Sequence, residues 1–184
     1  MKMKLNFTSP CDQEAGVLAS LLKRSYAGLV ESDPEHWGPE IPKWEQFDRE
    51  VFANPATIGR CVFLSWSENQ LVGLGSYDPR RKPAIGIVGH NCVLPEFRGR
   101  GLGRQQIQEI LRRFRVIGIK RAAVSTNAHP FFRPAQRMYA ACGFRETGRR
   151  PWDGDRSQDM IEYEIELDNN APQPIGAKRA SGSA

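Results

Sequence analysis

The sequence predicts one domain of the α/β (α+β) class, in which helices cover the faces of a mixed sheet. Two segments carry most of this prediction. Residues 161–167 alternate strictly between apolar residues and glutamates, which is typical of a half-buried strand. Residues 102–117 repeat apolar side chains at the spacing of one helix face. With 184 residues, 40% of them apolar and 26% charged, the chain has the size and composition of a globular protein with one core.

The first 93 residues predict a strand, two helices and then three strands. Pro, Gly and acidic residues crowd residues 30–44, so we expect a long loop there. Pro55 ends the second helix. Gly86 and Gly89 interrupt the third of the later strands, where isolated glycines mark a bulge or a close approach of ligand or backbone. The expected elements are a strand at 4–7, helices at 12–30 and 43–54, and strands at 61–66, 71–77 and 84–93.

The rest of the chain completes the order β-α-α-β-β-β-α-β-α-β-β. The helix that begins after Gly101 ends at Gly118, which supplies a natural stop. A strand at 122–126 and a helix at 134–144 precede the alternating strand. We therefore predict a single domain over residues 1–168. Residues 169–184 have too little apolar content to order themselves, so we predict a flexible C-terminal tail.

Charge, cysteines and apolar runs limit the partners and the location. A net charge of +5 suggests anionic partners without identifying them. The four cysteines match no zinc pattern, so we predict no metal and expect reduced thiols. The N-terminus lacks the apolar stretch of a secretory signal, and no run approaches the roughly 20 apolar residues of a membrane span. We expect a cytoplasmic protein with no membrane partner.

A run of glycines and arginines lies between an apolar strand and a helix. The first N–H groups of a helix lack internal partners, and the helix dipole adds positive potential there, so this junction is a candidate anion cradle. Missing Cβ atoms would let phosphate oxygens reach the backbone. The motif GxxxxGK[ST] is absent, and GxGxxG fails because position 104 is Arg. The predicted cradle consists of Arg98, Gly99, Arg100, Gly101, Leu102, Gly103 and Arg104.

Two motifs in this region resemble those of the GCN5-related N-acetyltransferases, the GNAT family. Residues 93–103 match the acetyl-CoA motif V-x-P-x-[FY]-R-G-x-G-[IL]-G, and residues 135–144 match A-x-x-x-Y-x-x-x-G-F, in the family order. The resemblance implies a GNAT-like mixed, mostly antiparallel central sheet with helices on both faces. It also implies an N-acetyltransferase that moves an acetyl group from acetyl-CoA to a primary amine of a small molecule or peptide. The neutral amine would attack directly in a ternary complex.

The resemblance implies roles for the central strand and for one tyrosine. The pantetheine arm of acetyl-CoA would run along Cys92, Val93 and Leu94, and the N–H near Val93 would face the thioester oxygen. Tyr139 occupies the family's position for the acid that protonates the leaving thiolate. Packing on an apolar helix face is the alternative role for Tyr139.

The base and one cofactor contact stay open at this point. His90 and Asn91 are candidates for removing a proton from the substrate ammonium. Strand alternation places His90 opposite Asn91 unless a bulge resets the phase, so a water chain is the alternative base. Family members commonly carry an asparagine where this chain has Phe132. Asn127 would either supply that cofactor contact from a different position or only cap its loop.

The acceptor pocket is expected beside the segment between the first two helices. The candidate substrate-binding residues there are Glu31, Trp37 and Trp44. Acidic groups with aromatic surface would suit a cationic, partly apolar amine, whereas the alternative is that the acids only keep a loop in solution. Residues 150–160 would line the opposite side.

Two other classes of function compete with an enzyme. Arg112, Arg113 and Arg115 would suit a nucleic-acid-binding module. They flank core positions of an amphipathic helix and no aromatic stripe accompanies them, which disfavours nucleic acid. A catalytically silent acyl-CoA sensor would share the fold, although an intact Tyr139 argues against it. The sequence leaves open whether the acyl group is longer than acetyl, and whether the chain is a monomer or a homodimer.

Overall fold

The structure is a computed structural model that describes residues 3–152 and 155–167, without the side chains of residues 152–158. The predicted tail at 169–184 lies outside the described residues. The strands are β1 (Asn6–Thr8), β2 (Val62–Ser67), β3 (Gln70–Asp78), β4 (Ile85–Val93), β5 (Arg121–Asn127), β6 (Arg145–Trp152) and β7 (Asp155–Glu166). The main helices are α1 (Val17–Ser32), α2 (Pro34–Trp37), α3 (Glu40–Ala53), α4 (Leu102–Val116) and α5 (Arg133–Ala141), with short 3₁₀ turns η3 (Pro95–Phe97) and η4 (Pro130–Phe132).

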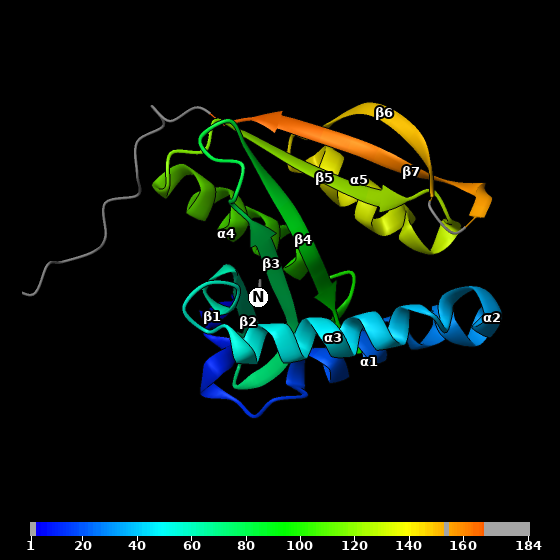
Figure 1. The fold of residues 1–184 in the computed structure, drawn as a ribbon, viewed down its shortest axis with the longest axis horizontal. Helices are drawn as coiled ribbons and strands as arrows, with labels where there is room; N and C mark the ends of the chain where they lie inside the picture. The colour runs from blue at the N-terminus through cyan, green and yellow to red at the C-terminus, as the bar shows by residue number, and fades with distance from the viewer. Residues whose placement is uncertain (1–2, 153–154, 168–184) are drawn as a thin grey trace, which may run out of the picture.

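The described strands form one mixed sheet in the order β1-β2-β3-β4-β5-β7-β6. Only the β4–β5 pair among them is parallel. Helices α4 and α5 cover one face, where Ile107 and Phe114 are buried against β4, β5 and β7. Helices α1 and α3 cover the other, where Leu18 and Val51 are buried against β2 and β3 (Figure 1). The predicted mostly antiparallel sheet with helices on both faces is confirmed.

Strands β4 and β5 separate soon after they pair. Their register covers only Ile85–Ile87 against Arg121–Ala123. Figure 1 shows the two strands diverging from this shared end, with β5, β6 and β7 on one side and the rest of the sheet on the other. The result is a fork inside the sheet, along which β4 has no strand partner on its β5 side in the part of the chain that the structure describes.

A bulge in β4 sets which side chains face this fork. Gly75 pairs with Asn91 and Tyr77 pairs with Val88, so β4 uses one more residue than β3 in this interval. Before the bulge, Val88 packs on the α4 side; after it, Cys92 packs in the core under α1 and α3. Gly89 lies in the bulge, where a Cβ would meet Ser76 Oγ at 2.5 Å. The predicted irregularity in this strand is confirmed.

The long loop predicted at 30–44 is wrong, because this segment is mostly helical. Helix α1 continues to Ser32, α2 follows, and α3 begins at Glu40. The Asp33 side chain accepts a hydrogen bond from the His36 N–H at 3.1 Å and so caps α2, whose first residue is Pro34. Pro39 is the N-cap of α3. Proline near the start of a helix removes no needed donor, so these prolines start helices here rather than break them.

A carboxylate from α3 caps the first turn of α1. The side chain of Asp48 is 3% exposed and accepts hydrogen bonds from the N–H groups of Gly16, Leu18 and Ala19 at 2.7, 2.9 and 3.2 Å. The N-cap residue Gly16 supplies no side-chain cap. Asp48 therefore satisfies donors that the helix leaves open, and it fixes α1 against α3.

Replacing Asp48 by Asn should lower the free energy of unfolding by about 2 kcal/mol, because the charge-assisted bonds weaken and the new NH₂ group meets donors. Urea denaturation measures the loss. Glu50→Gln, on an exposed position of α3, is the matched control and should cost less than a quarter of that value. Equal losses in the two variants would show that Asp48 does not anchor α1.

Candidate functional site

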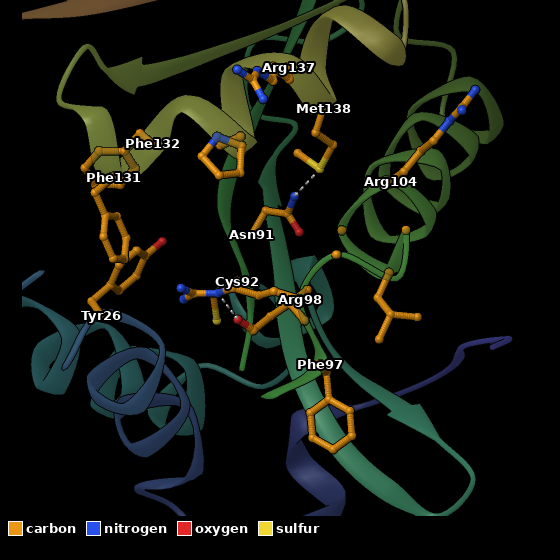
Figure 2. A pocket seen from close by; sticks show the side chains of 17 residues that line it. Tyr26, Asn91, Cys92, Phe97, Arg98, Arg104, Phe131, Phe132, Arg137 and Met138 are labelled. Carbon is orange, nitrogen blue, oxygen red and sulfur yellow. Dashed lines mark hydrogen bonds between the residues drawn. The ribbon is translucent and has the colours of Figure 1, made fainter. Parts of the chain in front are cut away.

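The fork between β4 and β5 contains a cavity of about 600 Å³ (Figure 2). Its walls come from α1, β4, η3, the start of α4, η4 and α5, and they are mostly apolar. Of the predicted site residues, those that line the cavity are Asn91, Cys92, Val93, Arg98, Gly99, Gly101, Leu102, Gly103 and Arg104. The fold thus brings the strand residues and most of the glycine-rich turn together in one place.

The glycine-rich turn has the geometry of an anion cradle. Gly99 and Gly101 have φ angles of +74° and +76°, which side-chain-bearing residues rarely adopt. A Cβ at either would meet no atom within 4 Å, so the space beside both is open. Gly101 is the N-cap of α4, and its carbonyl accepts the first bond of the helix from Gln105 N–H at 3.3 Å. The N–H groups of the first turn, from Leu102 on, therefore remain available to an anion.

Gly103, the third glycine of the run, is required for a different physical reason than Gly99 and Gly101. A Cβ on Gly103 would lie 2.9 Å from the Sδ of Met138 in α5. Glycine at this position therefore lets α4 approach α5 closely. Gly103 lines the cavity, but its missing side chain makes room for a helix contact.

The three arginines of the turn point in different directions. Arg104 lines the cavity beside the start of α4, together with Arg137 of α5, which the sequence did not single out. Arg98 crosses the cavity: its Nε donates to Val93 O at 3.0 Å, and its Nη2 donates to Ser25 O on α1 (Figure 2). Arg100 folds back and donates to Glu96 O at 3.1 Å. Of the three predicted arginines, Arg98 and Arg104 line the cavity and Arg100 does not.

The main chain of β4 faces the fork at every second residue. Leu94 N–H donates to Val72 O on β3 at 2.8 Å. Along an antiparallel strand, the main-chain N–H and C=O groups of successive residues point alternately toward and away from the neighbouring strand. Those of Cys92 therefore point toward β3, whereas those of Asn91 and Val93 point away from it. The bond from Arg98 to Val93 O agrees with this direction. Leu94 itself is 1% exposed in the core and does not line the cavity.

Two side chains of β4 enter the cavity with different chemistry. Asn91 has a buried Oδ1 with no hydrogen-bond partner among the described residues, and its Nδ2 lies 3.9 Å from Met138 Sδ (Figure 2). Burial raises the pKa of the Cys92 thiol, so this thiol is protonated at neutral pH and is a poor nucleophile. Asn91 therefore offers an open acceptor atom to a bound molecule.

Tyr139 lies behind the wall of the cavity and does not line it. It is 5% exposed, and its ring packs 5.8 Å from Phe144 and 5.9 Å from Tyr163. Burial raises the pKa of its hydroxyl. The neighbouring residue Met138 is the one that lines the cavity.

Tyr26 of α1, which sequence reasoning missed, lines the cavity instead. Its hydroxyl points toward the middle of the cavity (Figure 2), and its ring stacks on Trp44 at 5.3 Å. Burial raises the pKa of this hydroxyl as well. A tyrosine on the leucine-rich face of a helix gives no sequence signal that separates a cavity residue from a core residue.

His90 and Asn127 also lie outside the cavity lining. The His90 ring packs against Phe47 of α3 at 4.7 Å, and burial lowers its pKa. Asn127 Oδ1 accepts from His129 N–H at 2.6 Å and so caps its loop, while its buried Nδ2 has no partner among the described residues.

The predicted substrate residues take supporting positions. Glu31 is exposed near the end of α1. Trp44 and Trp37 are 6% and 5% exposed and lie behind the cavity walls rather than on them. Of the segment 150–160, predicted to line the opposite side, residues 153–154 and the side chains of 152–158 lie outside the described residues.

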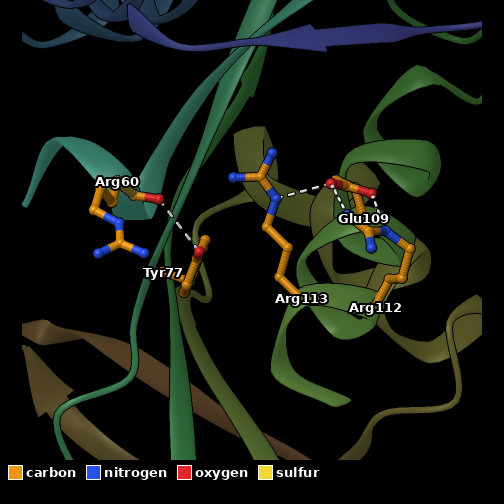
Figure 3. A network of polar contacts seen from close by, with 5 residues as sticks. All are labelled: Arg60, Tyr77, Glu109, Arg112 and Arg113. Carbon is orange, nitrogen blue, oxygen red and sulfur yellow. Dashed lines mark hydrogen bonds and ion pairs between the residues drawn. The ribbon is translucent and has the colours of Figure 1, made fainter. Parts of the chain in front are cut away.

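Several further predictions concern groups outside the cavity. The described residues contain no cluster of His, Cys, Asp or Glu that could hold a metal ion, and no described helix is long and apolar enough to cross a bilayer. All four cysteines are free thiols. On α4, Glu109 accepts from Arg112 at 2.7 Å and from Arg113 at 2.8 Å (Figure 3). Arg113 also lies over the Phe63 ring. These arginines are engaged within the protein.

Comparison with known proteins identifies the family. The model of the acetyltransferase (GNAT) family matches residues 21–144, which is more than half of the chain. The chain belongs to the GNAT family. A search of curated proteins finds no significant match for this GNAT protein.

Solved structures agree with this GNAT assignment at the level of the fold. A protein of Desulfovibrio desulfuricans assigned to the GNAT family superimposes with a TM-score of 0.69 at 20% identity, over 90% of this chain and 100% of its own. The yncA protein of Salmonella typhimurium, solved with its cofactor acetyl-CoA, gives 0.65 at 17% identity over 96% and 100%. At these identities the likeness shows the fold alone.

The two ends of α4 provide a matched test of the cradle. Gly101 and Gly118 flank the helix with φ of +76° and +77°, and a Cβ on either would meet no atom within 4 Å. Alanine at either should lower stability by about 1 kcal/mol through the same backbone strain. Only Gly101→Ala should also weaken binding of coenzyme A, by about tenfold or more, in calorimetric titration. Equal affinity in the two variants would contradict the cradle.

Proposed function

We propose that this GNAT protein is an N-acetyltransferase that moves an acetyl group from acetyl-CoA to a primary amine of a small molecule or peptide. The observation that carries the proposal is that an anion cradle and an unpaired stretch of β4 main chain meet in one cavity. The amine would attack directly in a ternary complex. Free thiols suit a reducing compartment, so we place the activity in the cytoplasm.

The residues of the cavity fit acetyl-CoA in charge and in hydrogen-bonding pattern. The N–H groups from Gly99 to Arg104 would hold the diphosphate, with Arg104 and Arg137 adding charge. The outward N–H and C=O groups of Asn91 and Val93 would hold the pantetheine arm in the manner of an added strand. For Val93 O to do so, Arg98 must release it. Bound acetyl-CoA supplies an activated acetyl group and a thiolate leaving group.

The chain's own groups would then stabilise charge and supply a proton. Val93 N–H faces the fork, where it would stabilise negative charge on the thioester oxygen. Tyr139 would donate a proton to the departing sulfur. Its raised pKa keeps it protonated at neutral pH, and it follows Met138, which lines the cavity, in the chain. Asn127 Nδ2 is a further open donor for the cofactor.

In this proposal, water is the base that removes the proton from the substrate ammonium. His90 has a lowered pKa and so is neutral at pH 7, but it faces Phe47 rather than the cavity. Asn91 does not titrate, so we assign it a positioning role through its open Oδ1.

The competing functions have weaker support. Of the arginines of α4 that suggested a nucleic-acid module, Arg112 and Arg113 are held by Glu109, and Arg113 also lies over the Phe63 ring. A silent acyl-CoA sensor would bind the same cofactor and differ only in releasing no thiol. Turnover separates it from an enzyme.

We expect the protein to release coenzyme A from acetyl-CoA only when a primary amine is present, with the acetylated amine detected by mass spectrometry. Tyr139→Phe should lower kcat about 100-fold and leave the Kd of acetyl-CoA within twofold, because the lost group acts on the leaving thiolate. Tyr163→Phe, which removes a hydroxyl from the ring packed against Tyr139, is the structural control and should keep kcat.

Three outcomes would contradict parts of this proposal. If the protein binds acetyl-CoA but releases no coenzyme A with any amine, the result would support the sensor. Equal kcat in the two variants would remove Tyr139 from the mechanism. Loss of turnover in Tyr26→Phe with full activity in Tyr139→Phe would assign the proton to Tyr26 instead.

A further inference from the structure

The cavity has two ends of different chemistry (Figure 2). The glycine-rich turn and Arg104 lie at one end. Tyr26, Phe131 and Phe132 lie at the other, and we call these three side chains the aromatic wall. Asn91 lies between the two ends. Because the anionic part of acetyl-CoA belongs at the basic end, the aromatic wall, whose Phe131 ring also lies against the Arg98 guanidinium at 5.4 Å, is left for the acceptor.

The rings of the aromatic wall come from two elements and lie close to one another. The Tyr26 ring on α1 lies 6.0 Å from Phe131 and 6.2 Å from Phe132, both on η4. Phe131 and Phe132 pack edge to face at 5.2 Å. Tilted and edge-to-face arrangements at these distances are favourable for aromatic pairs.

Buried tryptophans hold the aromatic wall from behind. Trp44 stacks on Tyr26 at 5.3 Å, and Trp37 lies 5.9 Å from Phe132. Both tryptophans are almost fully buried. The wall is therefore a supported surface rather than a set of independently mobile side chains.

The acidic residues expected to select a cationic acceptor lie elsewhere. No Asp or Glu side chain lines the cavity among the residues whose side chains the structure describes. Glu31 and Glu35 are exposed, and Asp33 caps α2. The helical structure of 30–44 turns these carboxylates toward solvent or toward the backbone.

We propose that the acceptor is a primary amine carried by an aromatic ring system, with the ring held by the aromatic wall and the amine directed toward Asn91. The inference rests on the proposed acetyltransferase activity. Ring-to-ring contacts would recognise such an acceptor. A second cationic group on the acceptor would find no carboxylate among the described residues that line the cavity.

A matched pair of amines tests this inference. 2-Phenylethylamine and 2-cyclohexylethylamine share a primary amine and a six-membered ring, and they differ in aromaticity. We expect kcat/KM to favour the aromatic amine about fivefold, and to favour it at least tenfold over 1,4-diaminobutane. Phe131→Leu should raise the KM for 2-phenylethylamine about tenfold and leave the KM for acetyl-CoA within twofold. Phe52→Leu, on α3 and outside the cavity lining, should change neither.

Binding without turnover gives an independent readout. Calorimetry on the protein saturated with coenzyme A should detect binding of 2-phenylethylamine. Phe131→Leu should abolish this binding. Preference for the diamine, or for the cyclohexyl compound, would overturn the aromatic acceptor while leaving the acetyltransferase in place. If no amine causes acetyl-CoA to release its thiol, the proposed function itself would be overturned. A preference of the aromatic wall for long-chain acyl-CoA over acetyl-CoA would assign it to the acyl group instead.

The side chain of Gln106 contacts the peptide unit between Cys92 and Val93. Gln106 of α4 is fully buried, and its Nε2 donates to Cys92 O at 3.1 Å and to Ser65 Oγ at 2.9 Å. A Cβ on Gly73 would lie 2.1 Å from the same carbonyl, so glycine there makes room for this contact. The helix that begins at the anion cradle is thus bonded to the strand that faces the fork.

We infer that Gln106 is a positioning residue that acts through Val93, again on the basis of the proposed activity. The Cys92 carbonyl and the Val93 N–H belong to one peptide unit and point in opposite directions. A donor to the carbonyl polarises that unit and strengthens the N–H as a donor to the thioester oxygen. It also fixes the plane of the peptide.

Gln106→Met, which keeps the length but cannot donate, should lower kcat about tenfold and leave the KM for acetyl-CoA within twofold. Ser65→Ala removes the other partner of Gln106 and should keep kcat. The amide resonance of Val93 in the protein bound to coenzyme A should shift only in the Gln106 variant. If Gln106→Met does not fold, Gln106→Leu, which also cannot donate, replaces it. Equal kcat in the Gln106 and Ser65 variants, or an unshifted Val93 resonance, would overturn the inference.

Discussion

The site depends on the separation of β4 from β5. The two strands pair over only three residues each, and beyond Ile87 and Ala123 the main chain of β4 has no strand partner on that side among the described residues, although Arg98 donates to Val93 O. Buried backbone N–H and C=O groups that stay unpaired are costly, so such an edge needs water or a ligand to complete it. Exposed sheet edges are normally blocked, because they recruit other chains. Here the edge lies inside the protein, where α1, α4 and α5 restrict access to it.

The bulge in β4 and the glycines around it determine what this edge presents. The bulge at Gly89 reverses the side-chain phase, so that Asn91 faces the cavity and His90 faces Phe47. Without the bulge, each side chain after Val88 would lie on the opposite face of the sheet. Gly73 on the neighbouring strand allows the tight contact between Cys92 and α4. One backbone irregularity therefore links the core packing to the composition of the site.

The cavity is chemically asymmetric because different elements build its two ends. The start of α4 supplies backbone donors and positive charge, whereas α1 and η4 supply aromatic rings. Arg98 connects these parts, since its guanidinium contacts Val93 O, Ser25 O and the face of Phe131 at 5.4 Å. An anionic cofactor at the basic end would compete for this arginine.

The sequence by itself determined the elements whose signals are local. The amphipathic pattern of α4 and the alternation of 161–167 depend on residues within a few positions of one another, and both appear in the structure as predicted. Local signals failed at 30–44, where prolines start helices instead of ending them. The tertiary structure alone decided that Tyr26 and Phe131 share a cavity while Tyr139 lies behind its wall. These residues are far apart in the chain, and an apolar helix face looks the same in sequence whether it packs in a core or borders a site.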